Sequence, residues 1–316
     1  MLDVSKLATL KAVVAHGSFS SAGHAIGLTQ PAVSRQVSLL ERQLGTQLVR
    51  RTQQGVHPTE AGKVLVGHAE AILGRLAAAE AQMADLAGLR AGHLRLGSFF
   101  TALVYLSAEL ATLLEARHPE LFHRQRDVIQ DELVDRATAF RRLAAAELDL
   151  AMVFEHAFEP EPPPAGIELV PLFDDPPCVL LPASHPLAGA RSVRPADLAG
   201  DTWIRAHHGS AARLVDHVLQ RAGLRPEILG AGHGDEPVEA QAFVAAGHGV
   251  MVAHGLNVLI EPERIAIAGL EGAPVRHVQA AIAEGQRAPA ALAALDCLRE
   301  LGRGRSLPRV KQAGRG

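Results

Sequence analysis

The chain of 316 residues is 48% hydrophobic but only 3% aromatic, which predicts two or three domains with cores of Leu, Val, Ile and Ala. Its two cysteines, Cys178 and Cys297, exclude a disulfide framework and are expected to be reduced and buried, and no apolar run reaches the length of a membrane span. The formal charge of -3 is unevenly spread, because residues 1–66 hold seven Lys and Arg against three acidic residues and the remainder is acidic. A basic head on an acidic body fits a protein whose head alone meets phosphate. The N-terminus has helical periodicity rather than the pattern of a signal peptide, so we expect a cytoplasmic protein.

Residues 18–63 predict a short helix, a tight turn, a second helix with a polar outer face and a basic wing. This is the layout of a winged helix-turn-helix, which places one helix in the DNA major groove. Ser18 is expected to cap the first helix and Thr29 the second, Pro31 falls in the first turn, and Gly45 ends the second helix. The apolar positions that recur at helical spacing are expected to face the core: Val33, Val37, Leu40 and Leu44.

The outer face of this second helix carries side chains that read base edges. Gln pairs with adenine, Arg with guanine, and Ser with either base edge. A merely solvated polar face is the alternative, but the next segment favours DNA binding, because two arginines beside a Gly-containing turn suit a wing that clamps phosphate. The predicted DNA-binding residues are Ser18, Thr29, Gln30, Pro31, Ala32, Ser34, Arg35, Arg50, Arg51 and Gln53.

Residues 59–88 predict one long helix that begins at Thr59 as its cap. Apolar residues recur along it with alternating spacings of four and three, which is a heptad seam. We expect the seam to form a homodimer, the alternative being a helix packed on its own domain. The seam residues are Leu65, Ala69, Ile72, Leu76, Ala79, Met83 and Leu86, and a hinge is expected at 88–92.

The rest of the chain alternates strands and helices in the order of a parallel sheet. The predicted elements of a first lobe are strands at 93–98, 122–129 and 148–154 and helices at 102–117 and 131–146. The Pro-rich segment 159–166 is expected to mark the crossover into a second lobe with strands near 168–173, 178–182 and 203–204 and helices near 210–222 and 236–246. The chain is expected to return to the first lobe around 256–268 and to close it with a helix near 288–302.

Two strings resemble the N-terminal domain of LysR-type transcriptional regulators, GSFSSAGHAIGLTQPAVSRQVSLLERQLGTQLVRR and HPTEAGKVL. Three more resemble the effector-binding domain of that family: ELDLAMVF at 147–154, LPASHPLA at 181–188 and FVAAGHGV at 243–250. The chain departs from the family at Gly23, where Ala is usual, and at Val49, where Phe is usual. A third departure, the segment 252–255, reads Val-Ala-His-Gly instead of an aliphatic stretch ending in Leu-Pro, and it alters the expected shape of the ligand cleft.

The resemblance implies an α/β protein with three parts and a tail. These are a winged helix-turn-helix at 1–58, a linker and dimerisation helix with its hinge at 59–91, a two-lobed effector-binding domain like a periplasmic binding protein at 92–303, and a disordered tail at 304–316. Lobe 1 is expected at about 92–160 and 266–303, and lobe 2 at about 161–265.

Helix N-termini that face a cleft between lobes suit a carboxylate ligand. The resemblance implies that the effector is contacted by Ser98, Phe100 and Thr101 from the first lobe and by Trp203, His207, Ser210 and His248 from the second. Core packing is the alternative for Phe99, Phe100 and Trp203, and a structural helix cap is the alternative for Thr101. Two adjacent Phe residues suggest an apolar or aromatic part to the ligand.

Catalytic motifs are missing from the sequence, which has no H-E-x-x-H, G-x-S-x-G or Walker pattern. The histidines of the second lobe have no Cys or acidic partner at ligand spacing, so we predict no metal and no cofactor beyond a small-molecule effector. The glycines of 230–234 read as a loop before a helix capped by Asp235. The sequence therefore predicts a ligand-responsive transcriptional regulator, not an enzyme, that binds dyad-symmetric double-stranded DNA as a dimer or tetramer, with RNA polymerase as a further partner. The alternative is a two-lobed solute-binding or enzymatic domain with a structural helical head.

Overall fold

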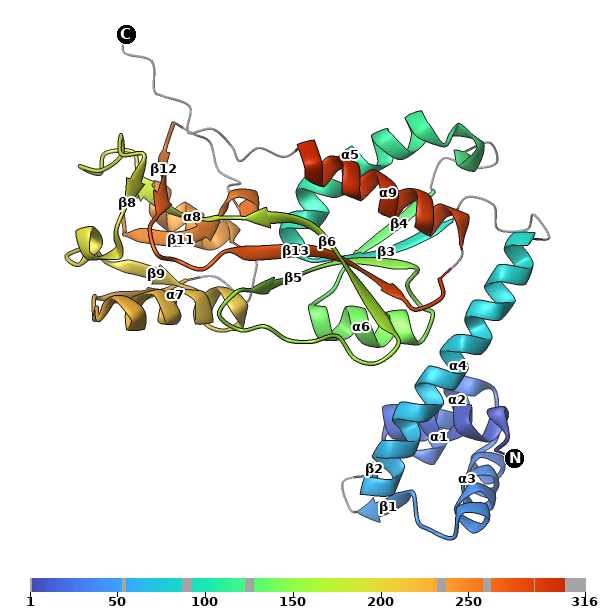
Figure 1. The fold of residues 1–316 in the computed structure, drawn as a ribbon. Helices are drawn as coiled ribbons and strands as arrows, with labels where there is room; N and C mark the ends of the chain where they lie inside the picture. Colours follow the sequence, from blue (N-terminus) through green and yellow to red (C-terminus); the bar gives the residue numbers. More distant parts are fainter. Residues whose placement is uncertain are drawn as a thin grey trace. The chain divides into compact units, whose positions relative to one another are not determined.

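The computed structural model describes residues 2–52, 55–86, 93–122, 128–231, 237–257, 263–286 and 288–304 (Figure 1). Its internal contacts divide the chain into two compact units, residues 1–90 with 141–148 and residues 91–140 with 149–316. The first contains three short helices, a small wing and a long helix, and the second contains two mixed sheets flanked by helices. Among the described residues, no helix is both long enough and apolar enough to cross a membrane.

The N-terminal unit is a winged helix-turn-helix, as predicted. Its elements are α1 (Val4–His16), α2 (Phe19–Ile26), α3 (Gln30–Leu44), β1 (Val49–Thr52), β2 (Gly55–Pro58) and the long helix α4 (Glu60–Leu86). The two strands of the wing pair antiparallel. Helices, wing and the start of α4 share one apolar core, which contains Leu7, Leu10, Val13, Phe19, Ala22, Val33, Val37, Leu40, Leu48, Val56 and Ala69.

Local chemistry sets most ends of these helices. The Ser18 hydroxyl accepts from the Ser21 N–H at 3.0 Å and caps α2, as predicted. Thr29 is the N-cap residue of α3, as predicted, but its hydroxyl does not make the expected cap hydrogen bond. Pro31 in the first turn favours the helix start. Gly45 ends α3 at φ +68°, a conformation in which Gly alone is unstrained. Leu44 was wrongly assigned to the core: it is 40% exposed, because α3 ends there and its neighbours from 42 to 47 all lie at the surface.

Side-chain oxygens accept from backbone N–H groups on both sides of the wing. The Glu41 carboxylate accepts from the Leu48 N–H at 2.9 Å, which ties the start of the wing to α3. The Thr59 hydroxyl accepts from the Gly62 N–H at 3.1 Å and caps α4, as predicted. Gly62 has no room for a Cβ atom, because that atom would run into the backbone carbonyl oxygen of Leu48. The start of α4 is therefore packed directly against the chain that enters the wing.

The first lobe of the second unit is built on a five-stranded sheet in the order β4-β3-β5-β13-β6. β3, β4 and β5 run parallel, and β13 runs antiparallel to β5 and β6. The strands are β3 (Leu94–Ser98), β4 (Ile129–Leu133), β5 (Leu150–His156), β6 (Ile167–Asp175) and β13 (Arg276–Ala283). The helices are α5 (Phe100–Arg117), α6 (Arg136–Ala144) and α9 (Pro289–Gly304), and α5 and α9 lie side by side over one face of the sheet (Figure 1).

The second lobe has a six-stranded sheet in the order β10-β9-β11-β7-β12-β8. Its strands are β7 (Pro177–Pro182), β8 (Ser192–Val193), β9 (Trp203–Arg205), β10 (Ile228–Gly230), β11 (Val250–His254) and β12 (Ile265–Leu270), and its helices are α7 (Gly209–Ala222) and α8 (Val238–Ala245). The described part of the unit also contains short 3-10 turns, η1 (Pro119–Phe122), η2 (Pro195–Leu198) and η3 (Gly255–Asn257). β9, β10 and β11 are parallel, as the alternation of strands and helices requires.

The assignment of two strands to lobes differs from the prediction. β6 was expected in the second lobe but pairs along its length with β13, because the Pro-rich segment 159–166 loops back to the first sheet instead of leaving it. β12 was expected near the return to the first lobe but pairs with β7 in the second sheet. The chain therefore leaves the first sheet between β6 and β7 and returns between β12 and β13.

Other differences concern ends of elements. The strand expected near 122–129 runs from Ile129 to Leu133, after η1. α8 has Pro237 as its N-cap residue. The predicted Asp235 cap, the hinge at 88–92, Gln53 and the tail beyond Gly304 lie outside the described residues.

Candidate functional site

The outer face of α3 is open to solvent at the positions predicted to read bases. Gln30, Arg35 and Ser38 are exposed, and Ser34 is half-buried. In the first turn, Pro31 is also exposed. The buried residues of the same helix belong to the core described above, so α3 has one face fixed by packing and one face available to a groove.

The two arginines of the wing have different surroundings. Arg50 lies opposite His57 in the wing, and its side chain is exposed. The Arg51 guanidinium lies over the ring of Phe19, with its central carbon 4.6 Å from the ring centroid, and donates to the Ser34 hydroxyl at 3.4 Å. Arg51 therefore connects the wing to α2 and α3, a role that the sequence analysis did not separate from phosphate binding.

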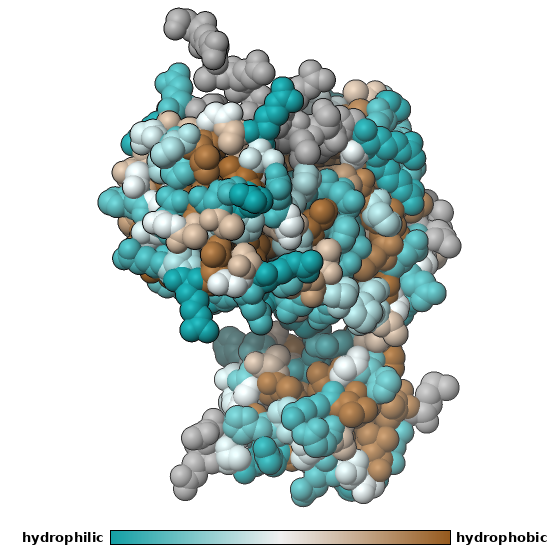
Figure 2. Space-filling view, turned by 60° about the vertical axis from the view of Figure 1, so that its left-hand side comes forward, coloured by the Kyte–Doolittle hydropathy of each residue, from teal (hydrophilic) through white to brown (hydrophobic). Residues whose placement is uncertain are grey.

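The predicted seam of α4 divides into two parts. Ala69 is buried and Leu65 packs partly against the N-terminal core, so both residues contribute to the packing of their own domain. The side chain of Leu86 lies outside the described residues. The remaining seam positions are exposed, namely Ile72 (41%), Leu76 (44%), Ala79 and Met83 (60%). Brown, apolar surface is visible on the N-terminal unit in the lower half of Figure 2. The apolar stripe from Ile72 to Met83 is thus left uncovered by the unit that carries it.

A cavity lies in the second unit where parallel strands of both sheets end. β3 and β5 end there in the first lobe, and β9, β10 and β11 end there in the second. Open α/β sheets bind ligands beyond the carboxyl ends of their strands. The cavity has a volume of about 40 Å³, room for a few water molecules, and adjoins a wider cleft of about 1050 Å³.

Three helices begin at this cavity. Thr101 from α5, Ser210 from α7 and Pro237 at the start of α8 all line it. The N-cap residues of these helices make no side-chain cap hydrogen bond. The positive ends of three helix dipoles therefore converge on one small space, which favours a negatively charged group there.

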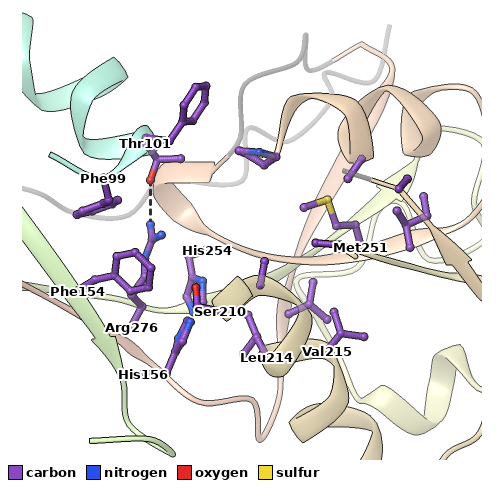
Figure 3. A pocket seen from close by; sticks show the side chains of 18 residues that line it. Phe99, Thr101, Phe154, His156, Ser210, Leu214, Val215, Met251, His254 and Arg276 are labelled. Atoms are coloured by element: carbon purple, nitrogen blue, oxygen red, sulfur yellow. Dashed lines mark hydrogen bonds between the residues drawn. The ribbon is translucent and has the colours of Figure 1, made fainter. Parts of the chain in front are cut away.

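A buried ion pair forms one side of the cavity. In the first sheet, Arg276 lies directly opposite His156 on one neighbouring strand and Asp175 on the other. Arg276 and Asp175 are each 3% exposed, and a guanidinium nitrogen lies 2.5 Å from a carboxylate oxygen. The same nitrogen donates to the Thr101 hydroxyl at 3.5 Å, across to the start of α5 (Figure 3). The pair places the Arg276 guanidinium, which is balanced by the Asp175 carboxylate, beside the helix N-termini.

Aromatic rings lie around the Arg276 side chain (Figure 3). The guanidinium carbon of Arg276 lies 5.2 Å from the ring centroid of Phe99 and 5.1 Å from that of Phe154. Phe154 meets His156 edge-on at 5.5 Å, and His156 stacks on His254 with 5.1 Å between centroids. Burial, the charge of Arg276 and the neighbouring His156 hold the pKa of His254 well below its usual range, so this ring is neutral at pH 7.

Some of the predicted effector residues reach the cavity and others do not. Phe100, Thr101 and Ser210 line it, as predicted. Thr101 is not the N-cap of α5, a place that Phe99 takes, so the alternative of a helix cap does not hold. Ser98 is completely buried and does not line the cavity. It is the last residue of β3, and its backbone carbonyl accepts from Val134, so it supports the turn rather than reaching the ligand space.

The other predicted residues of the second lobe also lie elsewhere. Trp203 is completely buried in the core of that lobe, where its indole N–H donates to the Leu198 carbonyl at 3.0 Å, so the alternative of core packing is the correct one. His207 is exposed and its ring lies against Gly230. His248 is exposed beside Phe243, because it follows the C-terminal end of α8 and not an end that faces the cavity.

Four residues at or beside the cavity were not predicted from the sequence: Arg276, Asp175, His156 and His254. Asp175 ends one strand and Arg276 begins another, 101 positions later, and no local pattern pairs them. His254 did carry a signal, because it stands in the segment that departs from the family pattern.

The two cysteines do not have the surroundings of reactive thiols, and the described residues contain no metal-ligand cluster. Burial raises the pKa of the Cys178 thiol to about 12, and the pKa of Cys297 is also raised by burial. Both thiols are buried and unpaired, as predicted, and neither has the depressed pKa of a reactive cysteine. Across the described ranges, no three His, Cys, Asp or Glu side chains gather as a metal site would require.

Family models match both units of the chain. One, described as "Bacterial regulatory helix-turn-helix protein, lysR family", matches residues 4–63. Another, described as "LysR substrate binding domain", matches residues 87–303. The chain belongs to the LysR family. It is a DNA-binding transcriptional regulator with an effector-binding domain and not an enzyme, as predicted, which sets aside the alternative of a solute-binding or enzymatic domain with a structural head.

Individual members of the family resemble the chain over most of its length. The regulator CysL of Bacillus subtilis (strain 168) is 29% identical over 224 residues, which cover 71% of each chain. The regulator CbbR of Sinorhizobium medicae (strain WSM419) is 29% identical over 280 residues, 87% of this chain and 85% of the relative.

Solved structures of full-length LysR proteins share the fold. A full-length variant of OxyR from Pseudomonas aeruginosa aligns over 100% of this chain and 99% of its own, with a TM-score of 0.67 and 22% identity. The LysR family regulator CbnR aligns over 95% and 99%, with a TM-score of 0.61 and 19% identity.

Proposed function

We propose that this LysR regulator reads base edges with Gln30, Ser34 and Arg35 of α3, and that Arg50 in the wing binds phosphate. The observation that supports this proposal is that Gln30 and Arg35 are exposed on a helix whose other face is fixed in the core. The helix is then positioned by Ser18, Thr29, Pro31, Ala32 and Arg51. We also propose that the protein acts in the cytoplasm, because its target is DNA.

Variants of these arginines separate the two kinds of contact. Arg35→Ala should cost about 1–3 kcal/mol of binding to the cognate site and little on random duplex. Arg50→Ala should weaken both duplexes alike and reduce the dependence on salt. The measurement is fluorescence anisotropy with both duplexes at several salt concentrations. If Arg35→Ala keeps the full preference for the cognate site, α3 is not the helix that reads bases.

Arg51→Lys tests the positioning role of Arg51. Lysine retains the charge, but it cannot reproduce the flat stack on Phe19 together with the bond to Ser34. We expect the preference for the cognate site to fall while binding to random duplex is kept. If Arg51→Lys keeps both the preference for the cognate site and the binding to random duplex, Arg51 contacts only phosphate.

We propose that the protein assembles through the stripe of α4 that includes Ile72, Leu76, Ala79 and Met83, giving a dimer or a tetramer on a dyad-symmetric site. The apolar exposure of this stripe supports the proposal. Ile72→Asp combined with Leu76→Asp should abolish the dimer, because association would bury charge. Ala71→Asp is the control, since Ala71 is exposed on the same helix about 100° away from Ile72. Sedimentation of the double variant as the native oligomer would mean that the stripe is not the interface.

We propose that the effector is a small carboxylate with an apolar body, bound where α5, α7 and α8 begin. The convergence of three uncapped helix N-termini and one buried arginine on an aromatic-walled cavity carries this proposal. Thr101 and Ser210 supply the hydroxyls, and Phe99, Phe100 and Phe154 supply the apolar walls. Regulation requires that the carboxylate bind two states of the oligomer with different affinity, and RNA polymerase is the partner that would read the difference.

Thr101→Val tests this site, because it preserves the side-chain shape and removes the hydroxyl. We expect DNA affinity without ligand to stay nearly unchanged and the response to a bound carboxylate to weaken. The measurement is footprint length and DNA affinity with and without acids that raise the melting temperature of the protein. Thr112→Val is the control, because Thr112 lies exposed on the same helix and its hydroxyl bonds only to the Ala108 carbonyl among the contacts described. An equal ligand response in Thr101→Val would remove this residue from the site.

A further inference from the structure

His254 lines the cavity and has a buried ring nitrogen without a hydrogen-bond partner among the described residues. The side chain is 1% exposed and lines the cavity, and its Nε2 has no hydrogen-bond partner among the described residues (Figure 3). The ring does bond the backbone carbonyl of Pro274. Because Nε2 is without a partner, that bond comes from Nδ1. A buried polar atom without a partner is costly, so such an atom at the edge of a ligand cavity indicates a group that the ligand completes.

The chemistry of this nitrogen is set by its surroundings. A carbonyl oxygen can only accept, so Nδ1 of His254 carries a proton and donates it to Pro274. Burial and the nearby Arg276 keep the pKa of the ring low, so a second proton is not held at neutral pH. Nε2 therefore has a lone pair and no proton, and it can only accept a hydrogen bond.

The charge of the cavity restricts which donor can approach. Arg276 is close enough to His254 to depress its pKa, so a cationic donor such as an ammonium group would meet the same repulsion. The guanidinium is matched by the Asp175 carboxylate, so the cavity has no surplus negative charge to offset a cation. A neutral hydroxyl group satisfies Nε2 without this penalty.

We propose that the effector is a hydroxycarboxylic acid: its carboxylate lies at the helix N-termini and its hydroxyl donates to Nε2 of His254. This inference rests on the proposed carboxylate site and adds the second polar group of the ligand. It also separates the effector from an amino acid of the same skeleton, which carries an ammonium group, and from the parent acid, which leaves Nε2 unsatisfied.

The test uses the full-length protein and two families of acids. Phenylacetate and isovalerate are each compared with their hydroxylated forms, with the hydroxyl at every available carbon, and with the forms aminated at C2. Binding is measured by isothermal calorimetry and by the shift in melting temperature. In at least one family we expect a hydroxylated acid to bind on the order of tenfold more tightly than its parent and its amino form.

Two variants assign the preference to His254. His254→Phe keeps a ring against His156 and removes the acceptor, so the hydroxylated acid and its parent should bind equally. His254→Gln restores an acceptor and should recover part of the preference. The urea-unfolding transition of Trp203 fluorescence without ligand checks that both variants are folded, because Trp203 is completely buried in the same lobe. Should His254→Phe not fold, 15N NMR of histidine-labelled wild type gives the same answer, because the hydroxylated acid should shift the resonance of Nε2 and the parent should not.

The outcomes separate this proposal from the carboxylate site itself. If the parent acids bind as tightly as the hydroxylated acids, or if the amino forms bind most tightly, the carboxylate site stands and the role of His254 is overturned. Retention of the full hydroxyl preference in His254→Phe overturns it as well. If no acid of either family binds, both the carboxylate site and the hydroxyl acceptor are wrong.

Discussion

The ion pair of Arg276 and Asp175 makes a quantitative prediction about stability. Asp175→Asn keeps the shape of the side chain and removes its charge. Both partners are 3% exposed, so the guanidinium cannot recover its hydration when the carboxylate is lost. Breaking a buried pair in this way costs about 3–5 kcal/mol. The rings of Phe99 and Phe154 remain near the guanidinium, but cation–π contacts of about 0.5–2 kcal/mol offset only part of that loss.

The single tryptophan provides the assay. Trp203 is completely buried in the second lobe, so its fluorescence reports unfolding of the effector-binding unit in urea or on heating. For a domain of this size about 1 kcal/mol shifts the melting temperature by roughly 2–4 °C, so Asp175→Asn should lower it by roughly 6–20 °C. Asp296→Asn is the matched control: it breaks an exposed pair with Arg299 and should cost about 0–1 kcal/mol.

A second substitution shows whether the cost comes from the unpaired charge. Asp175→Asn combined with Arg276→Met removes both charges, so it should be more stable than Asp175→Asn alone. If Asp175→Asn costs less than about 1 kcal/mol, or if the double variant is the less stable of the two, the pair is not desolvated as its burial indicates and the reasoning fails.

Three further predictions concern the glycine contact, the thiols and the buried histidine. Gly62→Ala should destabilise the N-terminal unit and weaken DNA binding despite the better helix propensity of Ala, because the added Cβ meets the Leu48 carbonyl. Gly67→Ala is the control, because nothing lies within 4 Å of its added Cβ, and it should stabilise the same helix by about 0.5–1 kcal/mol. The opposite order of melting temperatures would contradict this prediction. Cys178, with its pKa raised to about 12, should resist iodoacetamide at pH 8 in the native protein and react once urea unfolds it; fast native labelling would contradict the burial. The pKa of His254 lies well below the ordinary 6.5 in the folded state, so its contribution to stability is present above pH 6.5 and is lost as the pH falls through the folded pKa. Urea titrations should therefore show wild type losing more stability than His254→Phe between pH 7 and pH 5.

The sequence by itself determined the parts of this protein whose chemistry is local. The cap of Ser18, the left-handed end at Gly45 and the apolar spacing of α3 act over three or four residues, so the winged helix-turn-helix could be predicted with its exposed face. The order of strands and helices likewise predicted a two-lobed α/β domain, and the strand-to-helix turn at Thr101 was placed correctly at the cavity. The limit of local reasoning appears at Leu44, whose spacing fits the core but whose helix ends before the core is reached.

Tertiary structure alone decided which distant residues meet. β6 joins the first sheet because it pairs with β13, a choice made by strands about a hundred positions apart, and that pairing brings Asp175 to Arg276. The burial of Trp203 in the core, and the burial of Ala69 while Ile72 stays exposed, depend in the same way on which surfaces pack together. Local pattern limits the conformation of a segment, whereas burial and pairing depend on the whole chain, because side chains lose water only when other segments cover them.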